Sequence, residues 1–471
     1  MKIMVMSCSP KKEVSLTYQT YLFLELMFPD DTFDVHFTTD GTFPDELADA
    51  FREADLILVL SSIYHFSVHT QMVELFRNME HVLGKELKRK PITYMTTSGM
   101  NAEYFAHEYV EHWAERNEMH FISGLSMRDV GILSDKGKEE LYCWFTYAKS
   151  YVNDIHDAEM PQFKGNANVM IVDTSETNNP DNEKIITRLK QLYASSGGTV
   201  NVTKLRDYKL HPCIACSACY TNRICMIQDD FNAVIDRVFL HTDVLIFVGT
   251  VELGTMGYLY KLFTDRQVQF GRCSLEMSPI SLYVYSVSEK ALPEDIASFK
   301  NHEEMLALMH GFVNMGFVNG LDYDADERIR NAVKRTVYAY NSDLMPQTSG
   351  KSVGINYQFA RLAVNIQKIA PADYVWFYEH GWLNEPEALP KTAPAYDYKE
   401  SMEHQKNRTI PYSMQRLDFN GSVQITERNP YRDVPLTERK RKEAEPFANG
   451  TETIESRLGK RKKGLFGRKK S

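Results

Sequence analysis

The chain has 471 residues, of which 43% are hydrophobic and 25% are charged, and its formal net charge at pH 7 is −9. This length exceeds what one hydrophobic core normally holds, and the composition is that of a folded rather than a disordered protein. The acidic balance provides no overall basic field for nucleic acid, and no run of about twenty apolar residues predicts a membrane span.

The first residues, Lys2-Ile-Met-Val-Met, form a short apolar run that predicts a buried β-strand. The run is too short for the apolar part of a secretory signal peptide. Four of the seven cysteines are clustered in one place rather than scattered as disulfide pairs would be. Both features favour a location in the reducing cytoplasm.

A hydroxyl-rich loop, Ser7-Cys8-Ser9-Pro10-Lys11-Lys12-Glu13-Val14-Ser15-Leu16-Thr17, follows this strand and leads into a helix predicted over 16–27. Loop N–H groups and the dipole of the helix favour an anion at such a junction, so the loop suits a phosphate group. Capping of the helix by Ser15 or Thr17 is an alternative that needs no ligand. The chain contains neither G-x-G-x-x-G nor G-x4-G-K-[ST].

Short apolar runs then alternate with amphipathic stretches along the next 300 residues. Continuously apolar strands such as 56–60 and 244–248 are typical of parallel sheets covered on both faces. Helices are predicted over 70–83, 183–195 and 231–239. The alternation predicts an α/β fold of open, doubly wound parallel sheets, in which ligands bind beyond the carboxyl ends of the strands.

The strand pattern occurs twice. The segment starting at Lys2 matches the one at Asn168, and Phe33-Asp-Val-His matches Val200-Asn-Val-Thr. Further along, Ala54-Asp-Leu-Ile-Leu-Val-Leu-Ser-Ser matches Thr242-Asp-Val-Leu-Ile-Phe-Val-Gly-Thr. The fourth match is between Pro91-Ile-Thr-Tyr-Met and Pro279-Ile-Ser-Leu-Tyr. The sequence therefore predicts two related halves in tandem, at 1–155 and 165–335. The second half has extra residues between its second and third matched strands.

That extra segment contains Cys213, Cys216, Cys219 and Cys225, with the spacing C-x2-C-x2-C-x5-C. Cysteines at such short steps can direct their thiolates toward one point, which suits an iron–sulfur cluster or zinc. A thiol redox site and simple packing are the alternatives. Cys8, Cys143 and Cys273 show no such spacing and are predicted to be isolated buried residues.

The last third of the chain carries fewer signals. Residues 336–400 are predicted to be a helical, aromatic-rich packing segment, and 401–471 a surface-wrapping or disordered tail. The tail ends in a cluster of eight basic residues between 457 and 470. This cluster could touch an anionic membrane surface or an acidic partner, although a solubilising tail is the simpler interpretation.

These motifs together resemble the NADPH-dependent FMN reductase family, in its iron–sulfur flavoprotein branch. The resemblance implies two tandem flavodoxin-like domains followed by a C-terminal extension. Ser9, Pro10, Lys11, Ser15 and Thr17 match residues of the family's phosphate loop, which begins G-S-P-[RK], while Cys8 replaces the glycine. The resemblance implies an FMN site formed by Ser9, Pro10, Lys11, Ser15, Thr17, Ser61, Ser62, Ile63, Tyr64, Thr96, Thr97, Ser98 and Gly99.

The second half resembles the family in other places. It has the cysteine segment with the following Asp229-Asp230-Phe231, and a stretch from Lys261 to Asp265-Arg266, but its loop after the first strand lacks S-P-[RK]. The acidic side chains of Asp173 and Glu176 in that loop would repel a phosphate. We therefore expect the first half to hold FMN and the second half to hold a [4Fe–4S] cluster on its four cysteines.

The resemblance implies an NAD(P)H-dependent flavin oxidoreductase that passes electrons to an unknown small-molecule or protein acceptor. Relatives of this kind pair as dimers, so the tandem halves would form such a pair within one chain, and the chain could pair again as a homo-oligomer. No catalytic side chain is predicted, because flavin chemistry requires none. A cofactor-free interaction protein and a zinc or thiol sensor are the alternative functions.

Overall fold

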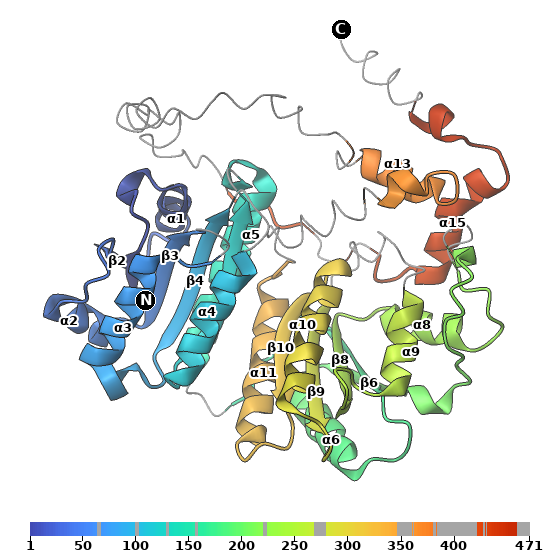
Figure 1. Ribbon diagram of the computed structural model, residues 1–471, viewed down its shortest axis with the longest axis horizontal. Helices are drawn as coiled ribbons and strands as arrows, with labels where there is room; N and C mark the ends of the chain where they lie inside the picture. Colours follow the sequence, from blue (N-terminus) through green and yellow to red (C-terminus); the bar gives the residue numbers. More distant parts are fainter. Residues whose placement is uncertain are drawn as a thin grey trace, which may run out of the picture. The chain divides into compact units, whose positions relative to one another are not determined.

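A computed structural model describes residues 1–63, 67–98, 103–128, 131–155, 159–219, 224–267, 279–345, 360, 362–379, 383, 422–426, 429 and 431–458. The chain divides into two compact units, each built around its own five-stranded sheet (Figure 1). Among the described helices, none is both long and apolar enough to cross a bilayer.

Unit 1 contains a sheet of order β2-β1-β3-β4-β5 in which all neighbouring strands are parallel. Its strands are β1 (Lys2–Ser7), β2 (Thr32–Phe37), β3 (Leu56–Ser62), β4 (Pro91–Ser98) and β5 (His120–Arg128). Its helices are α1 (Leu16–Met27), α2 (Asp45–Glu53), α3 (Thr70–Leu83), α4 (Glu103–Arg116) and α5 (Asp135–Asp154). Short 3₁₀ turns lie at Lys12–Val14, Gly84–Leu87 and Gly131–Leu133.

Unit 2 repeats this order, as β7-β6-β8-β9-β10 when read from its other edge. Its strands are β6 (Asn168–Asp173), β7 (Thr199–Lys204), β8 (Val244–Val251), β9 (Ile280–Val287) and β10 (Val313–Asn319). Its helices are α6 (Pro180–Ser195), α8 (Phe231–Phe239), α9 (Tyr258–Arg266), α10 (Pro293–Met309), α11 (Ala325–Asn341), α13 (Pro371–Glu379) and α15 (Leu436–Ala448), with a 3₁₀ turn at Leu205–Asp207.

The order 2-1-3-4-5 with parallel strands is that of the flavodoxin-like doubly wound fold. The predicted fold class, two flavodoxin-like α/β units in tandem, is therefore confirmed. Each of the four matched sequence pairs falls on strands with equivalent places in the two sheets, namely β1 with β6, β2 with β7, β3 with β8 and β4 with β9. The two halves thus share their topology strand by strand.

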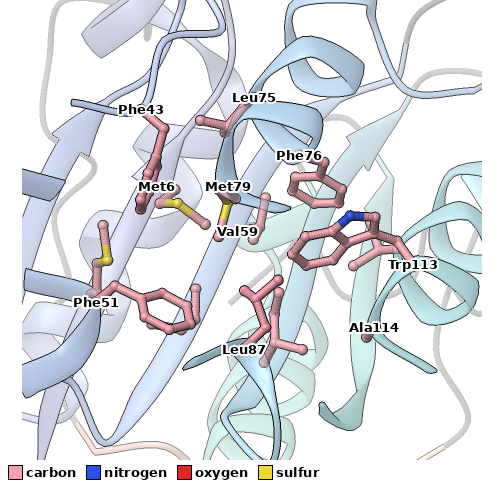
Figure 2. Close-up of a cluster of buried hydrophobic side chains, with 14 of the residues drawn as sticks. Met6, Phe43, Phe51, Val59, Leu75, Phe76, Met79, Leu87, Trp113 and Ala114 are labelled. Atoms are coloured by element: carbon pink, nitrogen blue, oxygen red, sulfur yellow. The ribbon is translucent and has the colours of Figure 1, made fainter. Parts of the chain in front are cut away.

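Both faces of each sheet are covered, which explains the continuous apolar runs in the central strands. In unit 1, α1 and α5 contact each other on one face. The other face packs against α2, α3 and α4 through a cluster that includes Met6, Phe51, Val59, Phe76 and Trp113 (Figure 2). The Phe76 and Trp113 rings stack there with their centroids 4.2 Å apart.

Aspartates at the start of equivalent strands have the same structural role in both units. Asp55 Oδ2 accepts the N–H of Lys2 at 2.7 Å, and Asp243 Oδ2 accepts the N–H of Asn168 at 2.9 Å. Each carboxylate therefore ties the third strand of its unit to the first. The "A-D" and "T-D" pairs seen in the sequence are structural and lie at the amino ends of the strands.

Part of the C-terminal region is ordered against unit 2. Leu436 of α15 is buried in the core beside α8, and Thr437 N–H donates to Asp236 Oδ1 at 3.0 Å. Arg432 pairs with Asp243 at 2.9 Å. In the preceding region, Phe377 is buried and packs with Ala360 and Ala363. The basic residues from 460 onward lie outside the described residues.

Candidate functional site

Four of the predicted FMN residues of unit 1, Ser15, Thr17, Ser62 and Thr97, come together where the carboxyl ends of β1, β3 and β4 meet the start of α1. The switch in strand order between β1 and β3 places this point where a flavodoxin-like sheet binds its ligand. Thr17 lies in the first turn of α1, Ser62 ends β3, and Thr97 is the penultimate residue of β4. Residues distant in sequence thus form one hydroxyl-lined site.

The hydroxyl groups of this site lie within hydrogen-bonding distance of one another. Thr17 Oγ1 is 2.6 Å from Thr97 Oγ1 and 3.2 Å from Ser62 Oγ, and Ser62 Oγ is 3.5 Å from Ser15 Oγ. Ser15, Thr17 and Thr97 are buried, whereas Ser62 is half-buried. Each hydroxyl can turn to donate to an anion, since its hydrogen rotates freely.

The N-terminus of α1 has no side-chain cap. Ser15 occupies the N-cap position but makes no hydrogen bond to the first turn, and its hydroxyl faces Ser62 instead. The first N–H groups of a helix have no partner within the helix, so an uncapped end favours a bound anion. The exposed Lys11 and Lys12 lie in the loop just before it. Capping by Ser15, the alternative explanation of the loop, is therefore not observed.

The loop between β1 and α1 is preformed by its own bonds. Ser9 is buried, its carbonyl accepts the N–H of Lys12 at 2.9 Å, and its hydroxyl accepts the N–H of Lys11 at 3.4 Å. Pro10 is exposed at the outer side of the turn. Cys8, in the place of the family's glycine, turns into the core, where its Sγ lies 3.3 Å from Thr38 Oγ1. Burial raises the pKa of the Cys8 thiol to about 12, so it is not a nucleophile.

The remaining predicted residues differ in where their side chains point, because successive residues of a strand face opposite sides of the sheet. Thr96 directs its hydroxyl to the opposite face from Thr97, where it lies 2.9 Å from Nε2 of the half-buried His107. Ser61 is also buried, and its hydroxyl donates to the Ser62 carbonyl at 2.9 Å. Ile63 is half-buried and packs against the core of unit 1. Tyr64, Gly99 and the Ser98 side chain lie outside the described residues.

Two histidines, His65 and His69, follow Tyr64 in the sequence, where they could contact a substrate. His69 is buried and caps α3, accepting the N–H of Met72 at 3.3 Å. Burial lowers the pKa of His69, which keeps the ring neutral in this role. His65 lies outside the described residues.

The corresponding place in unit 2 is occupied by its own side chains. Asn179 caps α6 by accepting the N–H groups of Asp181 and Asn182 at 3.0 and 3.2 Å. Asn182 donates to Ser175 Oγ at 2.9 Å and to Thr250 Oγ1 at 3.2 Å, and it accepts from Ser286 Oγ at 2.9 Å. The hydroxyls and helix N–H groups that would receive a phosphate therefore have partners already.

The charges in this second loop are also satisfied internally. Arg206 donates to Asp173 Oδ2 at 2.5 Å, to Asn178 Oδ1 at 3.0 Å and to Glu183 Oε1 at 3.1 Å. Asp173 was expected to repel a phosphate, but its charge is balanced by this ion pair. Hydrogen bonds and ion pairs of Asn179, Asn182 and Arg206 therefore hold the loop of unit 2 together. The sequence indicated a difference from the unit 1 loop through the missing S-P-[RK].

The four-cysteine loop leaves the end of β7 and returns at α8. Cys213 and Cys216 are exposed, and Cys219 and Cys225 are half-buried. Cys213 Sγ accepts the N–H of Ala215 at 3.4 Å, and Ala215 and Ser217 have φ angles of 51° and 60°. Burial and then the charges of the other three thiols raise the pKa of Cys219. The backbone therefore turns sharply between cysteines that lie close enough to interact electrostatically.

The described residues hold no group of three or more histidine, cysteine or acidic side chains placed to bind a metal ion, and they omit 220–223 of this loop. The thiolate donors and the N–H···S bond are of the kind that iron–sulfur clusters use. The convergence of four sulfurs that a cluster requires is not observed in the described part of the loop.

Both ends of the cysteine loop are fixed by one buried ion pair. Arg266 donates to Asp229 at 2.5 and 2.9 Å, and both side chains are almost fully inaccessible, at 1% and 0% exposure. Arg266 also donates to the carbonyl of His211 at 3.0 Å and lies 4.0 Å from the centre of the Phe231 ring. We refer to Arg266 and Asp229 as the loop clamp.

The clamp gives Asp229 a definite role. Although burial opposes its ionisation, the hydrogen bonds from Arg266 and from the His211 and Phe231 N–H groups lower the pKa of Asp229 to about 2. Asp229 thus caps α8 through Phe231 N–H and anchors the cysteine loop, whereas Asp230 makes no capping bond. The sequence contained both members of the clamp within motifs but did not indicate that they pair.

No family model matched the sequence, and a search of curated proteins found no match. Solved structures do show similarity. An NADPH-quinone reductase from P. pentosaceus shares 15% identity over 32% of this chain and 97% of its own, with a TM-score of 0.27. FerB, a flavoenzyme NAD(P)H:(acceptor) oxidoreductase from Paracoccus denitrificans, shares 18% identity over 26% of this chain and 75% of its own, with a TM-score of 0.23.

RosB, solved with bound 8-demethyl-8-formylriboflavin-5'-phosphate, shares 11% identity over 55% of this chain and 100% of its own, with a TM-score of 0.31. The fold of this chain is defined by its strand order, and its function is argued from its residues.

Proposed function

We propose that the chain is an NAD(P)H-dependent, FMN-containing oxidoreductase in which unit 1 binds the flavin. The observation that carries the proposal is the contrast between the two helix N-termini. The start of α1 is uncapped and lined by Ser15, Thr17 and Ser62 hydroxyls, whereas the start of α6 is capped by Asn179. The unit 1 hydroxyls bond to one another and can turn to donate to a phosphate, at the point where a flavodoxin-like sheet binds FMN.

In this proposal the residues of unit 1 hold and orient the cofactor. Ser9, Ser15 and Thr17 would donate to the FMN phosphate, and Lys11 would balance its charge. The segments 61–64 and 96–99 would lie against the flavin ring, with Thr97 linking them to the phosphate site through Thr17. The bound FMN would supply the redox chemistry, because it accepts a hydride from NAD(P)H and releases electrons singly.

The role of the cysteine loop is a second part of the proposal. Cys213, Cys216, Cys219 and Cys225 would be the four ligands of a [4Fe–4S] cluster that takes electrons one at a time. The motif spacing, the N–H···S bond at Cys213 and the anchoring of the loop by the clamp support this. An electron acceptor would then receive electrons from the unit 2 side.

The test is a matched pair of substitutions at equivalent positions. The N–H of Cys8 donates to the Leu60 carbonyl of β3, and the N–H of Thr174 donates to the Val248 carbonyl of β8, both at 2.9 Å. Because β3 and β8 are equivalent strands, the residues that follow, Ser9 and Ser175, occupy equivalent positions. A carboxylate at Ser9 would face the phosphate, and like charges in contact cost several kcal/mol. We expect Ser9→Asp to weaken FMN binding at least about 100-fold, measured by fluorescence titration of the flavin-stripped chain.

Ser175→Asp is the control and should leave FMN affinity unchanged. Because Ser9 is buried, the exposed Lys11→Glu provides a second variant that does not disturb the core, and it should also weaken binding. Unchanged affinity in both unit 1 variants would exclude FMN from this site. Loss of affinity only in Ser175→Asp would place the flavin in unit 2.

A further inference from the structure

The loops at the carboxyl edge of the unit 2 sheet carry exposed apolar side chains after four of its five strands. They follow β7, β8, β9 and β10 and are Ile214, Met226, Leu253, Tyr258, Leu292, Leu321 and Tyr323. Isolated exposed apolar residues are common on proteins, but a group on one edge is typical of an interaction surface. We refer to these seven residues as the apolar edge.

Leu253 is the most informative member of the apolar edge. It lies in a two-residue turn in which Glu252 N–H donates to the Thr255 carbonyl at 3.0 Å and Thr255 N–H returns to the Glu252 carbonyl at 3.2 Å. Leu253 and Gly254 have φ angles of 53° and 75°, which is the geometry that favours Asn-Gly. Leucine is disfavoured in this left-handed conformation, and its side chain is 83% exposed. Neither the turn nor the core explains a leucine here.

The charge of the same loops indicates what could cover this edge. Loops 252–258, 288–295 and 320–324 carry six carboxylates and one basic residue, Lys290, and Arg328 of α11 pairs with two of the carboxylates, Asp322 and Asp324. The carboxylates are Glu252, Glu289, Glu294, Asp295, Asp322 and Asp324. A second copy of the chain would bring the same acidic loops together in a two-fold dimer, which like-charge repulsion opposes. A partner with a basic and apolar face is complementary.

We propose that the apolar edge of unit 2 is the docking surface for a basic electron-carrier protein. Ile214 and Met226 of this edge belong to the cysteine loop, so a partner seated here would contact the loop itself. The identification of the partner as an electron carrier rests on the proposed function, whereas the surface and its charge do not. Leu253 would insert into the partner as an apolar anchor, surrounded by charged contacts.

The proposal is tested with an oxidised basic c-type cytochrome as the probe and the full chain as purified. Binding is measured by calorimetry at low and high ionic strength, without NAD(P)H, so that no turnover is involved. Leu253→Asn suits the left-handed turn better than leucine, so the thermal midpoint should not fall. We expect this variant to weaken cytochrome binding about tenfold, as loss of an interface anchor does.

Val82→Asn in α3 of unit 1 is the matched control, since it also replaces an exposed apolar residue and should leave binding unchanged. The proposal would be overturned if Leu253→Asn and Val82→Asn both left cytochrome binding intact. It would also be overturned if the original chain bound no cytochrome at low ionic strength. Self-association of the chain that Leu253→Asn abolishes would instead make the edge a dimer interface. Flavin content is measured on the same samples, so cytochrome binding by a flavin-free chain would support the docking surface while contradicting the proposed function.

Discussion

At the scale of single residues, the loop clamp explains how an exposed cysteine loop keeps a defined position. Arg266 uses one guanidinium group to hold Asp229 and the carbonyl of His211, which lie near the two ends of the loop. A buried ion pair of this kind adds little net stability compared with apolar residues, but removing one partner is costly. The clamp therefore positions the loop more than it stabilises the fold.

Arg266→Met should destabilise unit 2 by about 3 to 5 kcal/mol, because Asp229 would be left buried without its counter-charge. The measurement is urea unfolding followed by fluorescence. The double variant Arg266→Met with Asp229→Asn should recover part of the loss, since the orphaned charge is then removed. If the single and the double variant lost the same amount of unfolding free energy, the pair would not act through charge.

An exposed ion pair serves as the control. Arg52 pairs with Asp49 and Glu86 at the surface of unit 1. Solvent screens such pairs, so Arg52→Met should change the unfolding curve little. A loss as large as that of Arg266→Met would mean that burial is not what makes the clamp important.

At the scale of secondary structure, the packing of α4 on β4 and β5 depends on a neutral histidine. His107 of α4 lies 2.9 Å from Thr96 Oγ1, and its ring is 4.8 Å from that of Tyr94. Gly124 in β5 permits this approach, because a Cβ there would meet the His107 ring at 2.8 Å. The register of β4 with β5 shifts at this point. Burial lowers the pKa of His107 to about 4.

This pKa predicts that unit 1 loses stability in acid. Between pH 6.5, the ordinary histidine pKa, and about 4 the unfolded chain binds a proton that the folded chain does not. The contribution of neutral His107 to the free energy of unfolding is therefore complete above pH 6.5 and is lost as the pH falls through 4. This contribution amounts to about 3 kcal/mol. In His107→Gln the unfolding free energy of unit 1 should fall less between pH 7 and 4 than in the original chain. Parallel curves for the two proteins would contradict this.

The secondary structure was largely predictable, because buried parallel strands and amphipathic helices leave strong patterns in the sequence. The predicted helices over 16–27, 70–83 and 231–239 match α1, α3 and α8, while α6 begins three residues before its predicted start because Asn179 and Pro180 initiate it. The orientation of adjacent side chains was less accessible. Thr96 and Thr97 have similar chemistry, but only Thr97 joins the hydroxyl site.

At the scale of the whole chain, two units with the same strand order have different carboxyl edges. In unit 1 the edge has hydroxyls that bond to one another beside a helix start without a side-chain cap, and in unit 2 an asparagine network links the equivalent place. The tandem arrangement could be predicted from matching strands, since these matches depend only on burial. The asparagine network, Arg206 and the loop clamp could not, because they join residues from separate loops whose meeting depends on the finished fold.

The central claim is that unit 1 binds FMN and unit 2 does not. The most direct test is the flavin content of the full chain purified without oxygen and saturated with FMN, together with its iron and sulfide. The account predicts one FMN per chain, with about four irons if the cysteines hold one [4Fe–4S] cluster. Two FMN per chain would contradict the closure of unit 2 by its own side chains, and a chain that binds no FMN would contradict the site in unit 1.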